Sequence, residues 1–441
     1  MAEQTIEALQ SNFTGDIIKP GDSQYDQARA TYLFKGTPAL IARPRTASDV
    51  VQAVKYARDN KLLLSVRSGG HSGSGFSTND GGVVIDLMHM NSVEVLDTQT
   101  HRVRIGGGAL WGDIAIALQK HGLTLSSGDT KTVGVGGLTL GAGMGWMIRK
   151  YGLAIDSLVA AEVITADGAI RRASADEHSD LFWAIRGGGG NFGVGTSFEF
   201  IAHPMGKVYA GTIAYGVDDV AGVLKGWRDY MRQAPEELTT TLLIMPEFGG
   251  NPPAVIIMCC YASDDKGAAM QAVGPLQQLG KVVRQDIAEK DYADVLEEAH
   301  PPQGFKIITN NMFVRKFSDD LIETINKQKG HMLQIRSCGG AMNRVAAAAT
   351  AFAHRDSEAF MVMPAFVAPD ASAADIDVAL AGWRAIEHYG NGAYINFFTE
   401  LTGAEVPAAY PTATYERLAK IKQTYDPQNI FNQNYNITPH V

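Results

Sequence analysis

The sequence has few cysteines, and their positions exclude a disulfide framework. Three cysteines occur among 441 residues, namely Cys259, Cys260 and Cys338. The first two are adjacent, and adjacent cysteines can pair with each other only under strain. We therefore expect three small buried thiols, as in a protein of the reducing cytoplasm.

Positive charge and long apolar runs are also scarce. The chain has 38 Lys and Arg against 47 Asp and Glu, a formal net charge of −9. Nucleic-acid binding requires clustered Lys and Arg, and no such cluster occurs. No run approaches the ~18 apolar residues of a membrane span, and the N-terminus lacks the pattern of a secretion signal. We therefore expect a cytoplasmic protein that binds neither nucleic acid nor membranes.

Glycine, in contrast, is abundant and unevenly distributed. A large share of the 47 glycines lies within residues 69–195. The first cluster, residues 65–75, follows the apolar run 62–64 and precedes the apolar run 83–87, which indicates a strand, a loop and a strand. Backbone N–H groups of such a loop can approach and bind phosphate. Because His71 lies inside this loop, a cofactor bound by its diphosphate would lie within reach of an imidazole.

The other glycine clusters support a cofactor-binding lobe but not a nicotinamide site. Three further clusters follow, at residues 106–108, 134–145 and 187–193. The last one matches G-x-G-x-x-G at Gly188, Gly190 and Gly193. The dinucleotide fingerprint requires a strand before it and a helix after it. Here a helical pattern at 176–185 precedes it and a strand pattern at 195–201 follows, so we exclude a Rossmann site.

Length and local patterns predict two domains of the α+β class. A chain of 441 residues exceeds one ordinary core. In the first part, Thr46 predicts the N-cap of an amphipathic helix, and the turn signal Asp167-Gly168 predicts a hairpin. From about Met205 glycines become rare, and short strands alternate with helical patterns, which indicates an antiparallel sheet with helices.

Five motifs together resemble the flavin-linked oxidases of the vanillyl-alcohol oxidase superfamily, in the berberine-bridge-enzyme-like branch. They lie at residues 67–72, 132–137, 150–156, 189–193, and 415–418 with 425–431. They follow the order of the family and cover nearly the whole chain. The resemblance implies a two-lobed FAD-binding domain of the PCMH type at residues 1–205. It also implies a substrate-binding domain at 206–404, with an antiparallel sheet flanked by helices, and a return of residues 405–441 to the first domain.

The resemblance also implies how FAD is attached. The histidine of the family's diphosphate loop, here His71, carries the flavin through its 8α-methyl group. Many members add a second bond through a cysteine, but the equivalent residue is Thr130, whose hydroxyl is far less acidic than a thiol. We therefore expect a single covalent bond. Val133 occupies the position where valine goes with oxidase behaviour, because a small side chain leaves room for O2.

We expect the FAD-binding residues to come from these motifs and from the end of the chain. They are Arg67, Ser68, Gly69, Gly70, His71, Ser72, Thr130, Val133, Gly134, Gly136, Gly137, Gly143, Asp156, Asn191, Gly193, Asn434 and Asn436. Backbone N–H groups of the second loop would stabilise the negative charge of a reduced flavin. No metal is expected.

Candidate catalytic residues follow partly from the resemblance and partly from strand periodicity. By position, the catalytic base of the family corresponds to Tyr410. To act as a base, this tyrosine would need a pKa below the usual value of about 10. Alternatively, Tyr410 has only a packing role. Tyr394 and Asn396 resemble a second pocket segment. Gln334 and Arg336 alternate along a predicted strand, so both could point into the pocket or into solvent.

The implied activity is that of an FAD-dependent oxidase. It would dehydrogenate a C–H bond next to nitrogen or oxygen in a small organic substrate, with O2 as acceptor and H2O2 as product. The closing segment 434–437 favours a heterocyclic amine, and Tyr435 replaces a glutamine of the sugar oxidases. A secondary-metabolite alcohol, an oligosaccharide, a dehydrogenase with another acceptor and a non-catalytic flavin-binding module remain alternatives. Both a monomer and a homodimer are compatible with the sequence.

Overall fold

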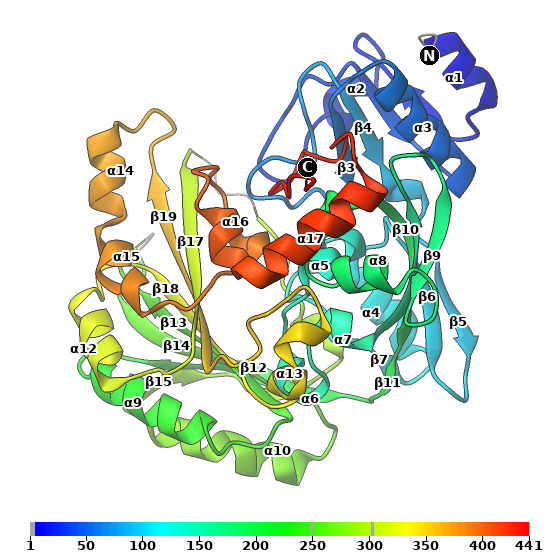
Figure 1. The fold of residues 1–441 in the computed structure, drawn as a ribbon. Helices are drawn as coiled ribbons and strands as arrows, with labels where there is room; N and C mark the ends of the chain where they lie inside the picture. The colour runs from blue at the N-terminus through cyan, green and yellow to red at the C-terminus, as the bar shows by residue number, and fades with distance from the viewer. Residues whose placement is uncertain (1–4, 248–249, 301–303, 441) are drawn as a thin grey trace.

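The computed structural model describes residues 5–247, 250–300 and 304–440, and these form two domains that lie side by side (Figure 1). The first half of the chain builds one domain and the middle of the chain builds the other. The last helix, α17 (Thr412–Tyr425), returns to the first domain and packs against α8 (Ser179–Ala184).

The first lobe of the first domain is a small mixed sheet that carries the His71 loop. Its strands, in spatial order, are β1 (Asp16–Ile18), β2 (Leu40–Arg43), β4 (Val83–Asp86) and β3 (Leu64–Arg67). Helix α3 (Ala47–Asp59) connects β2 to β3 and begins at the predicted N-cap, where Thr46 and Asp49 form a capping box. Since β3 and β4 are parallel, the loop after β3 has to cross back, and this crossing carries His71.

The second lobe is an antiparallel sheet of five strands. In spatial order they are β5 (Val93–Asp97), β6 (Arg102–Gly106), β10 (Val194–Ile201), β8 (Leu158–Ile164) and β9 (Ile170–Ser174). Strands β8 and β9 form the hairpin that the Asp167-Gly168 signal predicts. The glycines at 188–193 lie between helix α8 and strand β10, as predicted, and this order is the reverse of the one that the dinucleotide fingerprint requires.

Short elements of the first domain connect these strands. They are α1 (Ile6–Asn12), α2 (Tyr25–Ala28), α4 (Trp111–Gln119), β7 (Leu123–Thr124), α5 (Val135–Gly141), α6 (Ile148–Tyr151), α7 (Ala154–Ser157) and β11 (His203–Pro204). Helix α5 follows directly on the second predicted flavin loop, so it holds the end of that loop in place.

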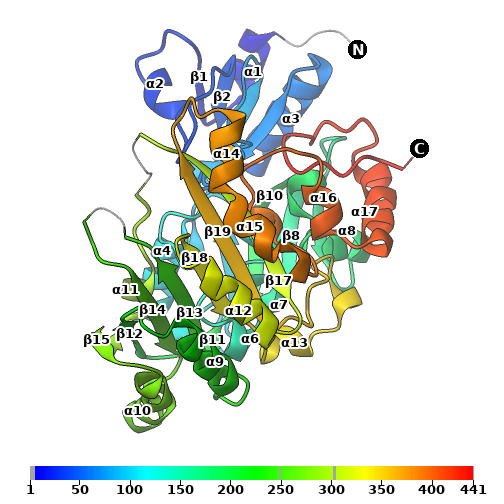
Figure 2. The same cartoon turned by 90° about the vertical axis from the view of Figure 1, so that its left-hand side faces the viewer.

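The second domain is built on an eight-stranded antiparallel sheet. In spatial order its strands are β15 (Val282–Gln285), β12 (Val208–Tyr215), β14 (Ala254–Tyr261), β13 (Leu238–Met245), β18 (Leu333–Ser337), β19 (Ala359–Val367) and β17 (Lys306–Val314), with β16 (Ala288–Lys290) beside β12. Its helices are α9 (Val220–Met231), α10 (Lys266–Val273), α11 (Tyr292–Val295), α12 (Asp319–Lys327), α13 (Ala341–Arg344), α14 (Ala373–Ala379) and α15 (Ala381–Ile386). Helices α9 and α12 cover the face of the sheet that is turned away from the first domain (Figures 1 and 2).

Side chains alternate between the two faces of this sheet, and the adjacent cysteines illustrate it. Cys259 packs in the core beneath the helices, whereas Cys260 packs in the core shared with the first domain. Both thiols, and that of Cys338, are buried and unpaired, as expected. The alternation leaves one face of β13, β14 and β18 free to form a wall of the functional site.

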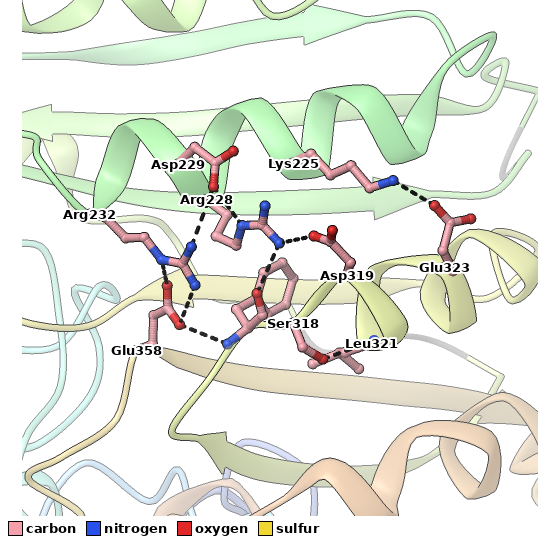
Figure 3. Close-up of polar contacts among 10 residues, drawn as sticks. Lys225, Arg228, Asp229, Arg232, Ser318, Asp319, Leu321, Glu323 and Glu358 are labelled. Carbon is pink, nitrogen blue, oxygen red and sulfur yellow. Dashed lines mark hydrogen bonds and ion pairs between the residues drawn. The ribbon is translucent and has the colours of Figure 1, made fainter.

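Ion pairs join the outer helices of the second domain (Figure 3). Lys225 contacts Glu323 at 2.7 Å, and Arg228 contacts Asp319. These partners are largely exposed apart from Arg228, and exposed pairs contribute little to stability. These pairs connect α9 with α12 at the surface, and none of their side chains lines the cavity described below.

The domain junction, in contrast, contains buried charges. Asp156 of the first domain forms a bidentate pair with Arg355 of the second, with distances of 2.7 and 2.8 Å. In the returning segment, the fully buried Lys422 pairs with Asp426 at 2.6 Å. None of the helices in the described part of the chain has the length and apolar character that a membrane span needs.

Candidate active site

A cavity of about 590 Å³ lies between the glycine loops of the first domain and the free face of the large sheet. Its volume is in the range of cofactor and small-molecule sites. Most of the predicted FAD-binding residues line it: Ser68, Gly69, Gly70, His71, Ser72, Thr130, Val133, Gly134, Gly136, Gly137, Asn191, Gly193 and Asn434. Loops that are far apart in the sequence therefore meet at one site.

Four residues that the sequence predicts to bind FAD lie outside the lining of this cavity. They are Arg67, Gly143, Asp156 and Asn436. Arg67 donates to Asp86 at 3.0 Å and so joins strands β3 and β4. Asp156 is engaged by Arg355 at the domain junction. Both side chains are thus held by protein partners, and their contact with FAD stays a prediction.

His71 is positioned as a neutral imidazole at the cavity wall. Its ring stacks on Tyr32 with a centroid distance of 4.6 Å, and its Nε2 lies 2.9 Å from Oγ1 of Thr132. Burial lowers the pKa of His71, so the ring is uncharged at neutral pH. A neutral imidazole offers a nucleophilic nitrogen, which covalent attachment of a cofactor requires.

The glycine loops leave no room for side chains where they meet. A Cβ added at Gly134 would lie 2.1 Å from Oγ of Ser68, and one added at Gly69 would lie 2.3 Å from the backbone nitrogen of Gly134. At Gly137 and Gly190, which line the cavity, an added Cβ meets no atom within 4 Å. Their bare faces therefore let a ligand approach the backbone closely.

One buried acceptor in this wall has no partner in the described residues. Oδ1 of Asn434 is buried and makes no hydrogen bond, although Nδ2 of the same side chain donates to the carbonyl of Phe431. Buried polar atoms are normally paired, and a ligand N–H or O–H would satisfy this one. The cradle and this acceptor both fit FAD.

The opposite wall comes from strand β18. Gln334 and Arg336 both line the cavity, as their alternation predicts. Arg336 is 1% exposed and forms an ion pair with Asp129 of the second flavin loop. It also donates to the carbonyl of Met144 at 3.1 Å, and its guanidinium lies over the ring of Trp146. The arginine is therefore fully engaged within the protein.

Tyr394 and Asn396 form the third polar group of the site. Both line the cavity. The Tyr394 hydroxyl accepts hydrogen bonds from the N–H of Gly143 at 2.9 Å and from Nδ2 of Asn396 at 3.1 Å. Burial raises the pKa of Tyr394 to about 12, and these two donors work against that rise. Because both contacts donate to the oxygen, they favour its deprotonated form.

Tyr410, the expected base, does not line this cavity. The residue is 3% exposed and packs in the core of the first domain. Its hydroxyl donates to the carbonyl of Gly187 at 3.1 Å. Burial raises the pKa of Tyr410, so the phenol stays protonated. A phenol held in this way has a packing role and cannot accept a proton from a substrate in the cavity.

Two acidic residues of the cavity were missed by the sequence analysis. Asp129 directly precedes Thr130, so its position next to the second loop could have predicted that it lies at the cavity. Glu297 has no comparable local signal. It reaches the cavity because its N–H donates to the carbonyl of Asp129 at 2.7 Å and its carbonyl accepts from the N–H of Lys131 at 2.9 Å. Burial raises the pKa of Glu297, and the charge of Asp129 raises it further.

Comparison with protein families matches two parts of the chain. Residues 38–174 match the family described as "FAD binding domain". Residues 393–438 match the family described as "Berberine and berberine like". The first match contains the His71 loop and the second loop, and the second contains Tyr394 and Asn434. Residues that line the cavity thus come from both matched segments and from the large sheet, whose strands lie between these segments in the sequence.

Known relatives resemble the chain over nearly its full length. (R)-6-hydroxynicotine oxidase of Paenarthrobacter nicotinovorans is 32% identical over 96% of this chain and 97% of that protein. Glucooligosaccharide oxidase of Sarocladium strictum is 29% identical over 90% of this chain and 86% of that protein. The crystal structure of 6-hydroxy-D-nicotine oxidase from Arthrobacter nicotinovorans superposes with a TM-score of 0.88 at 31% identity, covering 99% of this chain and all of the other.

Proposed function

This chain belongs to the berberine-bridge-enzyme-like FAD-linked oxidoreductases, and we propose that it is an oxidase. It removes hydrogen from a C–H bond next to nitrogen or oxygen in a small organic substrate, and O2 accepts the electrons to give H2O2. The observation that carries the proposal is a single cavity lined by His71 and Val133 on one side and by Tyr394 and Gln334 on the other.

The glycine loops and Asn434 would hold FAD, and His71 would carry it covalently. When bound, the flavin supplies the redox chemistry, because it can take two electrons from a substrate and return them to oxygen. Thr130 lines the cavity where some members of this family have a cysteine. Its hydroxyl is not a nucleophile at neutral pH, which supports one covalent bond through His71 and no second bond.

Tyr394 is the group that we assign to proton removal. Its hydroxyl lies at the cavity wall, and the Gly143 N–H and the Asn396 amide both donate to it. These donors orient the oxygen and stabilise the phenolate, the form that can take a proton from a substrate N–H or O–H. The proton moves to Oη of Tyr394 when the C–H bond of the substrate is oxidised.

Two features support an oxidase over the alternatives. Val133 lines the cavity with a small side chain, which leaves space for oxygen and argues against a dehydrogenase with another acceptor. The cavity is also lined by Gln334 and Tyr394, which lie outside the glycine loops where a substrate can contact them, and this argues against a module that binds flavin alone. The relatives named above act on a nicotine derivative and on oligosaccharides, and both kinds of substrate have C–H bonds next to nitrogen or oxygen. The buried free thiols support a cytoplasmic location.

The proposal is tested on the purified holoprotein. We expect a yellow protein whose flavin stays with the pellet after acid precipitation, and a His71→Ala variant that releases its flavin into the supernatant. Thr130→Ser is the matched control and should retain the flavin. After anaerobic reduction, mixing with air should restore the flavin spectrum within about a second, and a panel of amines, alcohols and sugars should contain a substrate that yields peroxide.

Each part of this experiment has an outcome against the proposal. Flavin released from the wild-type protein by acid would contradict covalent attachment. Reoxidation by air over minutes would favour a dehydrogenase that uses a different acceptor. Rapid reoxidation with no oxidisable compound among amines, alcohols and sugars would favour a binding module.

A further inference from the structure

The two nitrogens of the His71 ring lie in different surroundings. Nε2 lies 2.9 Å from Oγ1 of Thr132, a residue that does not line the cavity. Nδ1 makes no hydrogen bond with any described residue, and it is not fully buried. The ring of Tyr32 covers one face of the imidazole, with an angle of 15° between the two planes. The imidazole therefore turns Nε2 toward the protein and leaves Nδ1 accessible to a cofactor in the cavity.

The backbone around Thr132 is held on both sides by the start of helix α4. The carbonyl of Lys131 accepts a hydrogen bond from the N–H of Gly112 at 2.9 Å. The carbonyl of Val133 accepts one from the N–H of Trp111 at 3.0 Å. Because both neighbours are fixed in this way, the hydroxyl of Thr132 stays beside Nε2 of His71.

The direction of this one hydrogen bond decides which ring nitrogen is a nucleophile. A neutral imidazole has one N–H and one nitrogen with a free lone pair. If the Thr132 hydroxyl donates to Nε2, the hydrogen of the ring is on Nδ1, and Nδ1 cannot attack a carbon atom. If Nε2 donates to the hydroxyl, the lone pair is on Nδ1. Only the second arrangement presents a nucleophile at the accessible edge of the ring.

We propose that Thr132 is a positioning residue for flavin attachment, because its hydroxyl accepts the hydrogen bond from Nε2 and so holds His71 in the tautomer whose Nδ1 attacks the 8α carbon. This inference rests on the covalent attachment in the proposed function. Nδ1 forms the bond to carbon, while one C–H bond of the methyl group and the Nε2–H bond break. The electron pair of the C–H bond and the two protons reduce FAD, and O2 reoxidises it to give H2O2. The same hydroxyl then donates to Nε2, since threonine can both accept and donate.

The test follows attachment to the full-length chain. The protein is made in riboflavin-starved cells and mixed with FAD in air, and samples are precipitated with acid at intervals to measure bound flavin. Thr132→Val should attach flavin at least about tenfold more slowly than wild type, as expected for one lost hydrogen bond, and Thr132→Ser should restore the rate. Nitrogen-15 NMR of the flavin peptide then identifies the linked nitrogen. We expect Nδ1 in wild type and in Thr132→Ser, and a mixture of Nδ1 and Nε2 in Thr132→Val, a change that a merely structural role would not cause.

Thr31→Val is the matched control, because the hydroxyl of Thr31 bonds only to the backbone of Phe34 and does not reach His71. It should attach flavin at the wild-type rate.

Three outcomes would overturn the role of Thr132. They are a wild-type bond through Nε2, an equal loss of rate in Thr31→Val, and a Thr132→Val variant with the wild-type rate and the Nδ1 bond alone. If Thr132→Val does not bind FAD, the linked nitrogen in wild type and in Thr132→Ser decides. Wild-type protein that binds FAD without a covalent bond would contradict the attachment itself, and this inference with it. Slow reoxidation by air would contradict only the oxidase, because attachment is measured without substrate.

Discussion

At the scale of single residues, the environment of a hydroxyl decides which tyrosine can accept a proton. Tyr394 and Tyr410 are both buried, and burial raises the pKa of both phenols. The Tyr394 oxygen receives two hydrogen bonds, from Gly143 and Asn396, whereas the Tyr410 oxygen donates its proton to a backbone carbonyl. Received hydrogen bonds favour the phenolate, and a donated one favours the phenol. Of these two tyrosines, only Tyr394 lines the cavity and receives hydrogen bonds that oppose the effect of burial on its pKa.

Tyr394→Phe is therefore expected to slow anaerobic reduction of the flavin by an identified substrate about 10²–10⁴-fold, the usual effect of removing a general base. The pKa of about 12 gives the sign of the pH dependence. Below that value the phenolate fraction rises with pH, so the wild-type rate should rise through the alkaline range, and the variant should lose this rise. Stopped-flow absorbance measures both effects.

Tyr410→Phe is the matched control for this experiment. It removes one hydroxyl outside the cavity, so the reduction rate and its pH profile should stay close to those of wild type. Similar losses in both variants would mean that neither hydroxyl is the base. A Tyr394→Phe variant with the wild-type rate and profile would exclude Tyr394.

At the scale of secondary-structure elements, the five-stranded sheet is held together by one carboxylate on its central strand. Glu199 of β10 pairs with Arg102 at 2.5 Å and Arg104 at 3.0 Å, both on β6, and with Arg172 of β9 at 2.9 Å. Burial acts to raise the pKa of Glu199, but the hydrogen bonds from the three arginines outweigh it and bring the pKa to about 2. The sheet thus depends on the ionised form of this side chain.

Glu199→Gln should destabilise the holoprotein at pH 7 by about 1–3 kcal/mol, the contribution of charged hydrogen bonds that are partly screened. Because the pKa is lower in the folded state, this stabilisation is fully present above the ordinary value of about 4.5 and is lost as the pH falls toward 2. The difference between variant and wild type in urea unfolding should shrink between pH 5 and pH 3. Glu94→Gln, an exposed position on the edge strand β5, should show no such difference. If Glu199→Gln lowers the free energy of unfolding by the same amount at every pH, the ionised carboxylate does not stabilise the sheet.

At the scale of the whole molecule, the site exists only because the two domains are held at one orientation. The cavity is lined by loops of the first domain, by strands of the second and by the returning segment. Asp156 and Arg355 bridge the domains with side chains that are 9% and 2% exposed. A buried ion pair keeps its partners in one geometry, and removing one partner leaves the other charge uncompensated.

Asp156→Asn should therefore lower the stability of the holoenzyme by roughly 3–5 kcal/mol, as for other broken buried pairs. Scanning calorimetry measures the loss, and the flavin content reports whether the cavity survives. Asp377→Asn is the matched control, since Asp377 pairs with Arg384 at the surface, where both side chains are at least half exposed. A melting temperature that is the same in both variants would show that the junction does not depend on the Asp156–Arg355 pair.

Much of the fold was predictable because its signals are local. Thr46 with Asp49 marks a helix start, and Asp167-Gly168 marks a hairpin, since caps and tight turns depend on a few neighbouring residues. The alternation on β18 placed Gln334 and Arg336 on one face for the same reason. The glycine motifs indicated the FAD-binding loops because close backbone approach requires glycine there.

By itself, then, the sequence determined the family and pointed to the glycine loops and to His71, because all of these depend on short motifs. Only the tertiary structure decided that Tyr394 lines the cavity and Tyr410 does not, that Asp156 and Arg67 form buried ion pairs, and that Glu297 lies at the cavity. The physical reason is that these outcomes depend on packing between segments far apart in the chain. Spacing along the sequence does not specify which side of such a contact a side chain faces.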